Sequence, residues 1–321
     1  MAMHRSRARA GWLSRSRLLI ALTVSLILAI RPVAADDGET VLRDSETEAY
    51  FHDIAKPIIE AAGLDPNNVK IQLIGDMEIN AFVSGGQVVN INAGLIKAAD
   101  NTNPLHGVIS HELGHIVAGH VINGAGVKEA TGISVLSLLL AGAAAAAGGG
   151  GAAMGVLMAG QQAAMGKYLA FSRTEEASAD AAGASYLMKA HISGKGTLDF
   201  FKKLEQEEYR LSSSYAPTDP FAQTHPMSED RIANLEQGYK SSPWWNAKTD
   251  PALDVRFNRI KAKLIGYMEE PEQTFRLYPE TDHSVPAMYA RAYAWHRAAY
   301  PDKAIAEIDK LVATAPHDPY F

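Results

Sequence analysis

The motif His111-Glu112-Leu113-Gly114-His115 combines residue types that can hold and use a metal ion. Residues four apart lie on one face of an α-helix, so both imidazoles can point at one ion, and Glu112 can reach a water molecule on it. Zinc suits this set. Two neutral imidazoles bind it, the ion lowers the pKa of its water towards about 7, and a carboxylate accepts the proton as the water attacks. The motif therefore predicts a catalytic zinc site.

The residues around the motif favour a buried site over two exposed histidines on an ordinary helix. The flanking side chains are apolar: Val108, Ile109, Leu113, Ile116 and Val117. A helix of this composition is expected to be buried, and buried histidines need partners. His120 lies five residues after His115, about 140° around the helix, so it is not expected to be a ligand.

A catalytic zinc needs a third protein ligand and one open position. Because the chain has no cysteine, that ligand must be a histidine or a carboxylate. The stretch SRTEEASAD, residues 172–180, carries Glu176 and Asp180 four apart on one predicted helix face. Glu176 could bind zinc while Asp180 accepts the outer N–H of a ligand histidine. A solvated acidic face is the ordinary alternative, and from spacing alone Glu175 competes with Glu176.

The pattern of apolar and polar residues predicts the elements that position these side chains. Asn103 is the expected N-cap of the motif helix, Pro104 suits its first turn, and Asn123-Gly124 should end it. The strand over residues 87–92 is a candidate sheet edge that could pair with an extended substrate. Helices are expected over residues 44–62, 93–99, 168–188, 197–211 and 230–239, and strands over residues 69–73, 80–83 and 87–92.

Residues 1–35 have the features of a secretory signal peptide, with an uncleaved anchor as the alternative. Five arginines precede an apolar run of 13 residues, Leu18–Ile30, and Val33-Ala34-Ala35 suits a cleavage site. Removing this segment takes away six arginines and no acid, which changes the formal charge from −6 to −12. Such a chain has no electrostatic reason to bind nucleic acid. An exported protein without cysteine suits a bacterial periplasm.

Residues 130–166 carry no charge and divide at Gly148-Gly149-Gly150-Gly151 into two halves rich in Ala, Gly and Leu. Two interpretations stay open. The halves form buried helices or a loop of small residues, or they form a hairpin that dips into a membrane face as a peripheral contact. A two-pass span is less favoured, because each half is short and weakly hydrophobic.

The C-terminal region, residues 246–321, is expected to be helical. Segments 289–300 and 302–315 predict a helix–turn–helix, and its second helix has the spacing of a tetratricopeptide repeat, with a generic helical hairpin as the alternative. A single repeat cannot bury its apolar face alone. Either the region packs on the rest of the protein, or the chain continues beyond Phe321, which we expect.

The order HELGH then SRTEEASAD resembles the gluzincin peptidases of the HtpX, CAAX-prenyl-protease and BepA group, whose pattern is HExxH then SRxxExxAD. The likeness extends over roughly residues 45–235. It implies an α+β, zincin-like fold that is mainly helical, with a small sheet beside the HExxH helix. It places the peptidase domain within residues 36–245, the third zinc ligand at Glu176 and the paired aspartate at Asp180. The leader and the tetratricopeptide-like tail are most similar to BepA-like periplasmic members, which are proteases and chaperones of outer-membrane protein assembly.

The same resemblance extends to Thr224-His225-Pro226 and Arg231. It implies that His225 is a displaceable fourth zinc ligand that holds the enzyme off, and that Arg231 is needed for activity, where it could steady the developing oxyanion. A loop histidine and a surface salt bridge are the plain alternatives. A fourth protein ligand would close the site, so His225 would have to move for catalysis.

Three classes of function compete. The first is a zinc endopeptidase with one zinc ion per chain, acting on misfolded or unassembled envelope proteins; in it His111, His115 and Glu176 bind the metal and Glu112 moves the proton. The second is a chaperone or adaptor that binds clients, or the outer-membrane assembly machinery, through its helical tail with little proteolysis. The third is a zinc-binding scaffold without activity.

Overall fold

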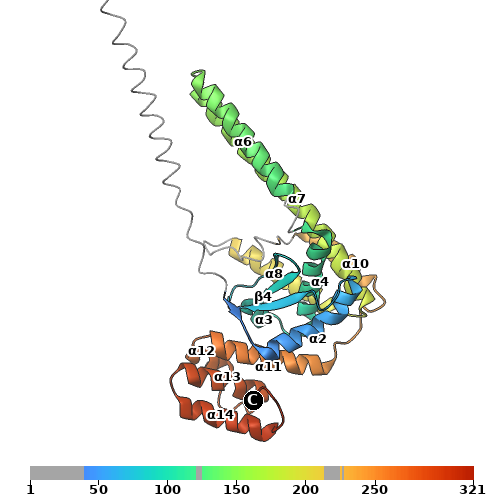
Figure 1. Ribbon diagram of the computed structural model, residues 1–321, viewed down its shortest axis with the longest axis vertical. Helices are drawn as coiled ribbons and strands as arrows, with labels where there is room; N and C mark the ends of the chain where they lie inside the picture. The colour runs from blue at the N-terminus through green and yellow to red at the C-terminus, as the bar shows by residue number, and fades with distance from the viewer. Residues whose placement is uncertain (1–39, 121–124, 213–224, 226–227) are drawn as a thin grey trace, which may run out of the picture. The chain divides into compact units, whose positions relative to one another are not determined.

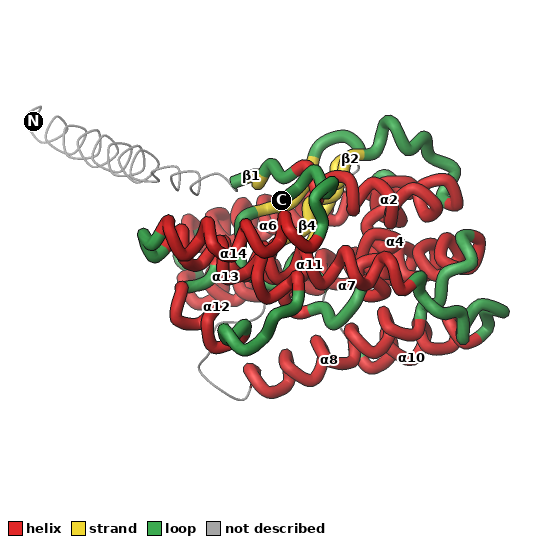
Figure 2. Tube along the Cα trace, turned by 90° about the horizontal axis from the view of Figure 1, so that it is seen from below, coloured by secondary structure: helices red, strands yellow, loops and turns green. Residues whose placement is uncertain are grey.

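The computed structural model describes residues 40–120, 125–212, 225 and 228–321. The predicted signal peptide, residues 1–35, lies outside the described residues. Helices dominate the described part, and a small sheet lies among them (Figure 2). The predicted α+β architecture, mainly helical with a small sheet, is confirmed.

The sheet has four strands in the order β1-β2-β4-β3. The central pair is parallel, and β4 is also antiparallel to β3, while β1 is antiparallel to β2. Because β4 is hydrogen-bonded on both sides, the prediction that residues 87–92 form a free edge is wrong; the edges of the described sheet are β1 and β3. The strands are β1 (Val41–Leu42), β2 (Lys70–Ile74), β3 (Ala81–Ser84) and β4 (Val88–Asn92).

The helices of the main body agree with the sequence pattern within a few residues, and the predicted helix over 168–188 is the second half of a longer one. The side chain of Asp44 caps α2, and that of Ser228 caps α10. These helices are α2 (Ser45–Ala61), α3 (Ala93–Ala98), α7 (Gly150–Lys189), α8 (Lys195–Ser212) and α10 (Glu229–Lys240).

The motif helix α4 (Thr102–Ala118) is buried from its first residue to His115. Both predicted ends are wrong. Asn101 is the N-cap, and the amide of Asn103 serves inside the fold, where Nδ2 donates to the Ser193 carbonyl at 2.7 Å and Oδ1 accepts from the Thr197 N–H at 3.0 Å. The helix stops at Gly119, whose φ of 68° lies in the left-handed region that glycine adopts without steric cost.

The uncharged segment forms most of α6 (Ala125–Ala146) and the first part of α7, which lie side by side (Figure 1). Gly148, with a φ of 86°, lies in the turn between them. The interpretation as buried helices is wrong, because large apolar side chains of both helices are exposed, among them Leu139 at 67% and Met158 at 64%. Among the described residues, no helix is both long and apolar enough to span a bilayer.

The C-terminal helices are α11 (Pro251–Met268), α12 (Pro271–Leu277), α13 (Val285–Arg297) and α14 (Pro301–Thr314), so the predicted helix–turn–helix is confirmed. Its likeness to a tetratricopeptide repeat stays a prediction. Phe257, Ile260 and Leu264 of α11 belong to the main hydrophobic core, whereas α13 and α14 share a smaller one. The predicted domain boundary near residue 246 stays a prediction. α11 follows this boundary in sequence, yet it packs into the hydrophobic core of the predicted peptidase domain.

The second half of α7 packs closely against α4, and this contact fixes its position. A Cβ atom on Gly114 would lie 2.8 Å from the carbonyl oxygen of Ala179 and 2.9 Å from its Cα, and one on Gly183 would lie 3.0 Å from the Ser110 hydroxyl. These distances are shorter than normal contacts, so two glycines let the helices approach. Because Glu176 and Asp180 lie before and after Ala179 in α7, this helix contact places both of them next to α4.

We expect Gly114→Ala to lower the free energy of unfolding by about 1–3 kcal/mol, because the new methyl group must push α7 away. The same displacement should lower the zinc content of the purified protein. Gly142→Ala is the matched control, since a Cβ there meets nothing within 4 Å. Chemical denaturation and metal analysis measure both effects, and equal results for the two variants would contradict this account of the packing.

Candidate metal centre

Four buried side chains from three parts of the chain converge on one point. His111 and His115 come from successive turns of α4, Glu176 comes from α7, and His225 lies beyond α8. One ligand atom of each lies within 4.8 Å of the others. The structure thus brings together both motif histidines, the expected third ligand and the expected fourth.

The distances from His111 and from the Glu176 carboxylate to the other groups are close to those around a tetrahedral ion. His111 Nε2 lies 3.0 Å from His115 Nε2 and 3.4 Å from His225 Nδ1. The Glu176 carboxylate lies 3.4 Å from His111, 3.2 Å from His115 and 3.1 Å from His225. Four ligands about 2.0–2.1 Å from a tetrahedral zinc would be separated by roughly 3.3 Å. The donor set of nitrogen and carboxylate oxygen also suits zinc.

The electrostatics of the group favour a cation. Burial alone would raise the pKa of Glu176, but hydrogen bonds from His111, His115 and His225 outweigh it and hold this pKa far below the ordinary value. Burial likewise opposes a charge on His111, yet Asp180 and Glu176 raise its pKa to about 10. A metal ligand must be a neutral imidazole, so metal binding has to displace a proton from this site.

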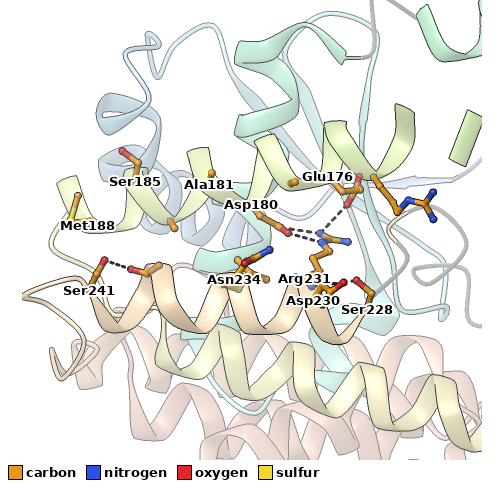
Figure 3. Close-up of a pocket in the computed structure, with 15 residues that line it drawn as sticks. Glu176, Asp180, Ala181, Ser185, Met188, Ser228, Asp230, Arg231, Asn234 and Ser241 are labelled. Atoms are coloured by element: carbon orange, nitrogen blue, oxygen red, sulfur yellow. Dashed lines mark hydrogen bonds and ion pairs between the residues drawn. The ribbon is translucent and has the colours of Figure 1, made fainter. Parts of the chain in front are cut away.

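Asp180 and Arg231 lie directly behind the ligands. Asp180 Oδ1 is 2.9 Å from His111 Nδ1, the ring nitrogen that faces away from the other ligands. The guanidinium of Arg231 donates to both oxygens of Asp180, at 2.6 and 2.9 Å, and lies 2.9 Å from Glu176 (Figure 3). Its Nη1 also donates to the backbone carbonyl of His225 at 3.1 Å. Burial raises the pKa of Asp180, but Arg231 and His111 more than offset it, so the pKa is lowered.

Glu112 lies beside the ligand group without joining it. Its side chain is 1% exposed, its Oε1 has no hydrogen-bond partner, and that oxygen is 3.7 Å from His225 Nε2. A buried carboxylate oxygen without a partner is costly, and such an atom usually marks a place for water or a ligand. Glu112 is therefore positioned to accept a proton from a molecule held at the centre.

His120 is the residue that the sequence analysis missed. It is not one of the four grouped ligands, as predicted, but its position does not follow the rotation of α4, because α4 ends at Ala118 and the backbone turns at Gly119. His120 Nδ1 lies 2.8 Å from His115 Nδ1, and its Nε2 lies 3.2 Å from the Ser178 hydroxyl, which donates to the Glu175 carbonyl at 2.9 Å. If His115 binds metal through Nε2, its Nδ1–H can donate to His120. The signal in the sequence was a histidine just after the glycine that ends the helix.

Glu175, the competitor for the third ligand position, is not in the group. It is half-buried, and burial followed by the charge of Glu176 raises its pKa. A cavity of about 570 Å³ lies between α7 and α10, and Glu176 and Arg231 are among the residues that line it (Figure 3). Small side chains such as Ala181 and Ser185 line it on α7, and Asn234 lines it on α10.

Comparison with known proteins gives a family match and several relatives. The profile of peptidase family M48 matches residues 45–238. The chain is similar to the putative beta-barrel assembly-enhancing protease of Vibrio cholerae, 25% identical over 293 residues, which are 89% of this chain and 59% of that protein. It is also similar to metalloprotease LoiP of Escherichia coli, 32% identical over 174 residues, 53% of this chain and 62% of that protein. The mitochondrial metalloendopeptidase OMA1 of Schizosaccharomyces pombe is 26% identical over 214 residues, 65% of this chain and 58% of that protein. The chain thus spans about three fifths of each relative.

We expect His120→Ala to weaken zinc binding by roughly 10–100-fold, because His115 loses the acceptor that fixes its tautomer and ring orientation. Competition with a chelator measures the affinity. His283→Ala is the control, since that histidine is exposed in the C-terminal region. If His120→Ala bound zinc as tightly as the control did, the contact with His115 would have no role in the metal site.

Proposed function

Because this chain belongs to peptidase family M48, whose members depend on zinc, we propose that it is an endopeptidase in which His111, His115 and Glu176 hold one zinc ion. The observation that carries the proposal is the convergence of these three buried side chains with Glu112 at their side. A purely structural zinc site has no need of a buried carboxylate with an oxygen that lacks a hydrogen-bond partner. If the chain were only a zinc-binding scaffold, the burial of Glu112 beside the metal ligands would have no explanation.

The chemistry divides between the ion and the chain. Zinc, when bound, lowers the pKa of a water molecule and polarises the carbonyl of the bond to be cleaved. Glu112 accepts the proton of the attacking water and passes it to the leaving amine. Asp180 keeps His111 in the tautomer whose Nε2 can bind metal. No covalent bond forms between the enzyme and the peptide.

His225 is the proposed gate of this site. With four protein ligands a tetrahedral zinc has no open position, so hydrolysis requires His225 to leave. Arg231 holds the backbone carbonyl of His225 and the side chains of Asp180 and Glu176 at once. This arrangement supports a positioning role for Arg231, which ties the gating residue to the ligands. Its contribution to an oxyanion stays a prediction.

The proposed substrates are misfolded or unassembled proteins of the bacterial envelope, met in the periplasm. Two observations support this. The chain is similar to beta-barrel assembly-enhancing proteases over most of its length, and residues 1–35 have the pattern of a signal peptide. The second candidate is a chaperone or adaptor with little proteolysis. The presence of His225 in the ligand group supports it, because a closed site holds clients without cutting them.

We expect Glu112→Gln to reduce cleavage of an unfolded protein such as casein by roughly 10²–10⁴-fold, because the amide cannot accept the proton. Zinc content and thermal stability should stay at the wild-type values. Glu175→Gln is the matched control, a similar change on α7 outside the ligand group. Undiminished cleavage by Glu112→Gln would overturn the peptidase proposal.

We expect His225→Ala to raise the rate of casein cleavage at saturating zinc, because one coordination position becomes open. The zinc affinity should fall, since one ligand is lost, so metal occupancy must be measured in the same sample. A lower rate at full zinc occupancy would mean that His225 acts directly in catalysis. Activity equal to that of wild type would mean that His225 does not gate the site.

A further inference from the structure

The hairpin, defined as α6 with the first part of α7 up to residue 166, is packed with its small residues inside and its large apolar residues outside. A Cβ atom on Gly160 would lie 2.0 Å from the Cβ of Ser137, so the helices touch through these two residues. In a helical pair surrounded by water, large apolar side chains face the partner helix. Here the exposed large side chains are Val135, Leu136, Leu138, Leu139, Leu140, Met154, Met158 and Met165. Close contact through small residues is typical of helix pairs in lipid.

The polar groups of the hairpin also suit a surrounding without water. Residues 130–166 contain no charged side chain. The hydroxyl of Ser134 donates to the Ala130 carbonyl at 2.9 Å, and that of Ser137 donates to the Ser134 carbonyl at 2.8 Å, so both are satisfied within their own helix. Hydrocarbon requires such internal pairing. The exposed amides of Gln161 and Gln162 then limit how deep the hairpin can go.

We propose that the tip of this hairpin, residues 138–158, inserts into one leaflet of a lipid bilayer. From Leu138 to Gly148 the chain has ten steps of about 1.5 Å, roughly 15 Å, which is half of a hydrocarbon core about 30 Å thick. Insertion of the tip thus needs no spanning helix. Lys128 and Glu129 precede the uncharged segment and Lys167 follows it, so the charged residues lie outside the part that inserts.

The distribution of the exposed side chains favours lipid over a second copy of the chain. Leu138, Leu139 and Leu140 follow one another, so they cover about 200° of the circumference of α6. Docking of another hairpin would need a single apolar stripe, which leaves the other directions in water. A bilayer surrounds the inserted tip and covers all of them. The proposal does not depend on the peptidase activity.

The absence of cysteine allows a dye to be placed at one position of the full chain. We expect an environment-sensitive dye on Leu139→Cys to shift to shorter wavelength and to gain intensity severalfold when vesicles of phosphatidylethanolamine and phosphatidylglycerol are added. The same dye on Val255→Cys, at a position with an equal exposed fraction of 67%, should not respond. The dye reports on the hairpin whatever the apolar residues 18–30 do.

A charge at the tip provides the second measurement. With the dye on Met158→Cys, the further change Leu139→Asp should weaken insertion of the hairpin by roughly 100-fold, the penalty for a carboxylate in hydrocarbon. Val255→Asp should leave the response unchanged. The response should also persist in the Glu112→Gln background, so that failure of the peptidase proposal is distinguishable from failure here.

Three outcomes would overturn the proposal. The first is a dye on Leu139→Cys that does not respond to vesicles. The second is a response on Met158→Cys that Leu139→Asp leaves intact. The third is a shift that grows with protein concentration in the absence of vesicles, together with a dimer in sedimentation velocity, which would assign the surface to a second copy.

Discussion

The carboxylate of Glu176 lies buried among three imidazoles and one guanidinium, and the site depends on this position. His111, His115, His225 and Arg231 all lie within 3.4 Å of its oxygens. A buried carboxylate is costly unless it is paired or binds a metal, so the groups around it and the ion they imply are required together. The glycine contacts between α4 and α7 bring the carboxylate to the histidines. Helix packing and charge compensation thus meet at one residue.

Arg231 extends this constraint from the ligands to the chain around His225. Its planar guanidinium binds Asp180 through two parallel hydrogen bonds, which suits arginine and not lysine. Because the same group donates to the carbonyl of His225, the position of His225 is coupled to those of Asp180 and Glu176. In the proposed gating, movement of His225 would break only the hydrogen bond to its carbonyl and would leave the two between Arg231 and Asp180 in place.

Buried ion pairs, as well as apolar packing, hold the C-terminal helices against the peptidase domain. Glu46 at the start of α2 is 5% exposed and accepts from Lys263 at 2.6 Å and from the hydroxyl of Tyr289 at 3.2 Å. Arg259 also pairs with Glu46 and binds Asp318 near the end of the described chain. Removing one member of such a cluster leaves an uncompensated charge. The helical region is therefore joined to the domain that holds the metal centre.

The sequence alone determined the features that depend on local spacing. The HExxH motif requires only that residues four apart share a helix face, and most helices and strands follow the period of their apolar residues. Spacing could not choose between Glu175 and Glu176, because that choice depends on which side of α7 meets α4. It also assigned the wrong ends to α4 and a free edge to β4, since helix caps and strand neighbours are set by residues distant in sequence. The contact of His120 with His115 and the outward apolar surface of the hairpin were decided only by the tertiary structure. The positive φ of Gly119 turns the chain so that His120 reaches His115. In the hairpin, contact between α6 and α7 through Ser137 and Gly160 decides which face of each helix is turned inward.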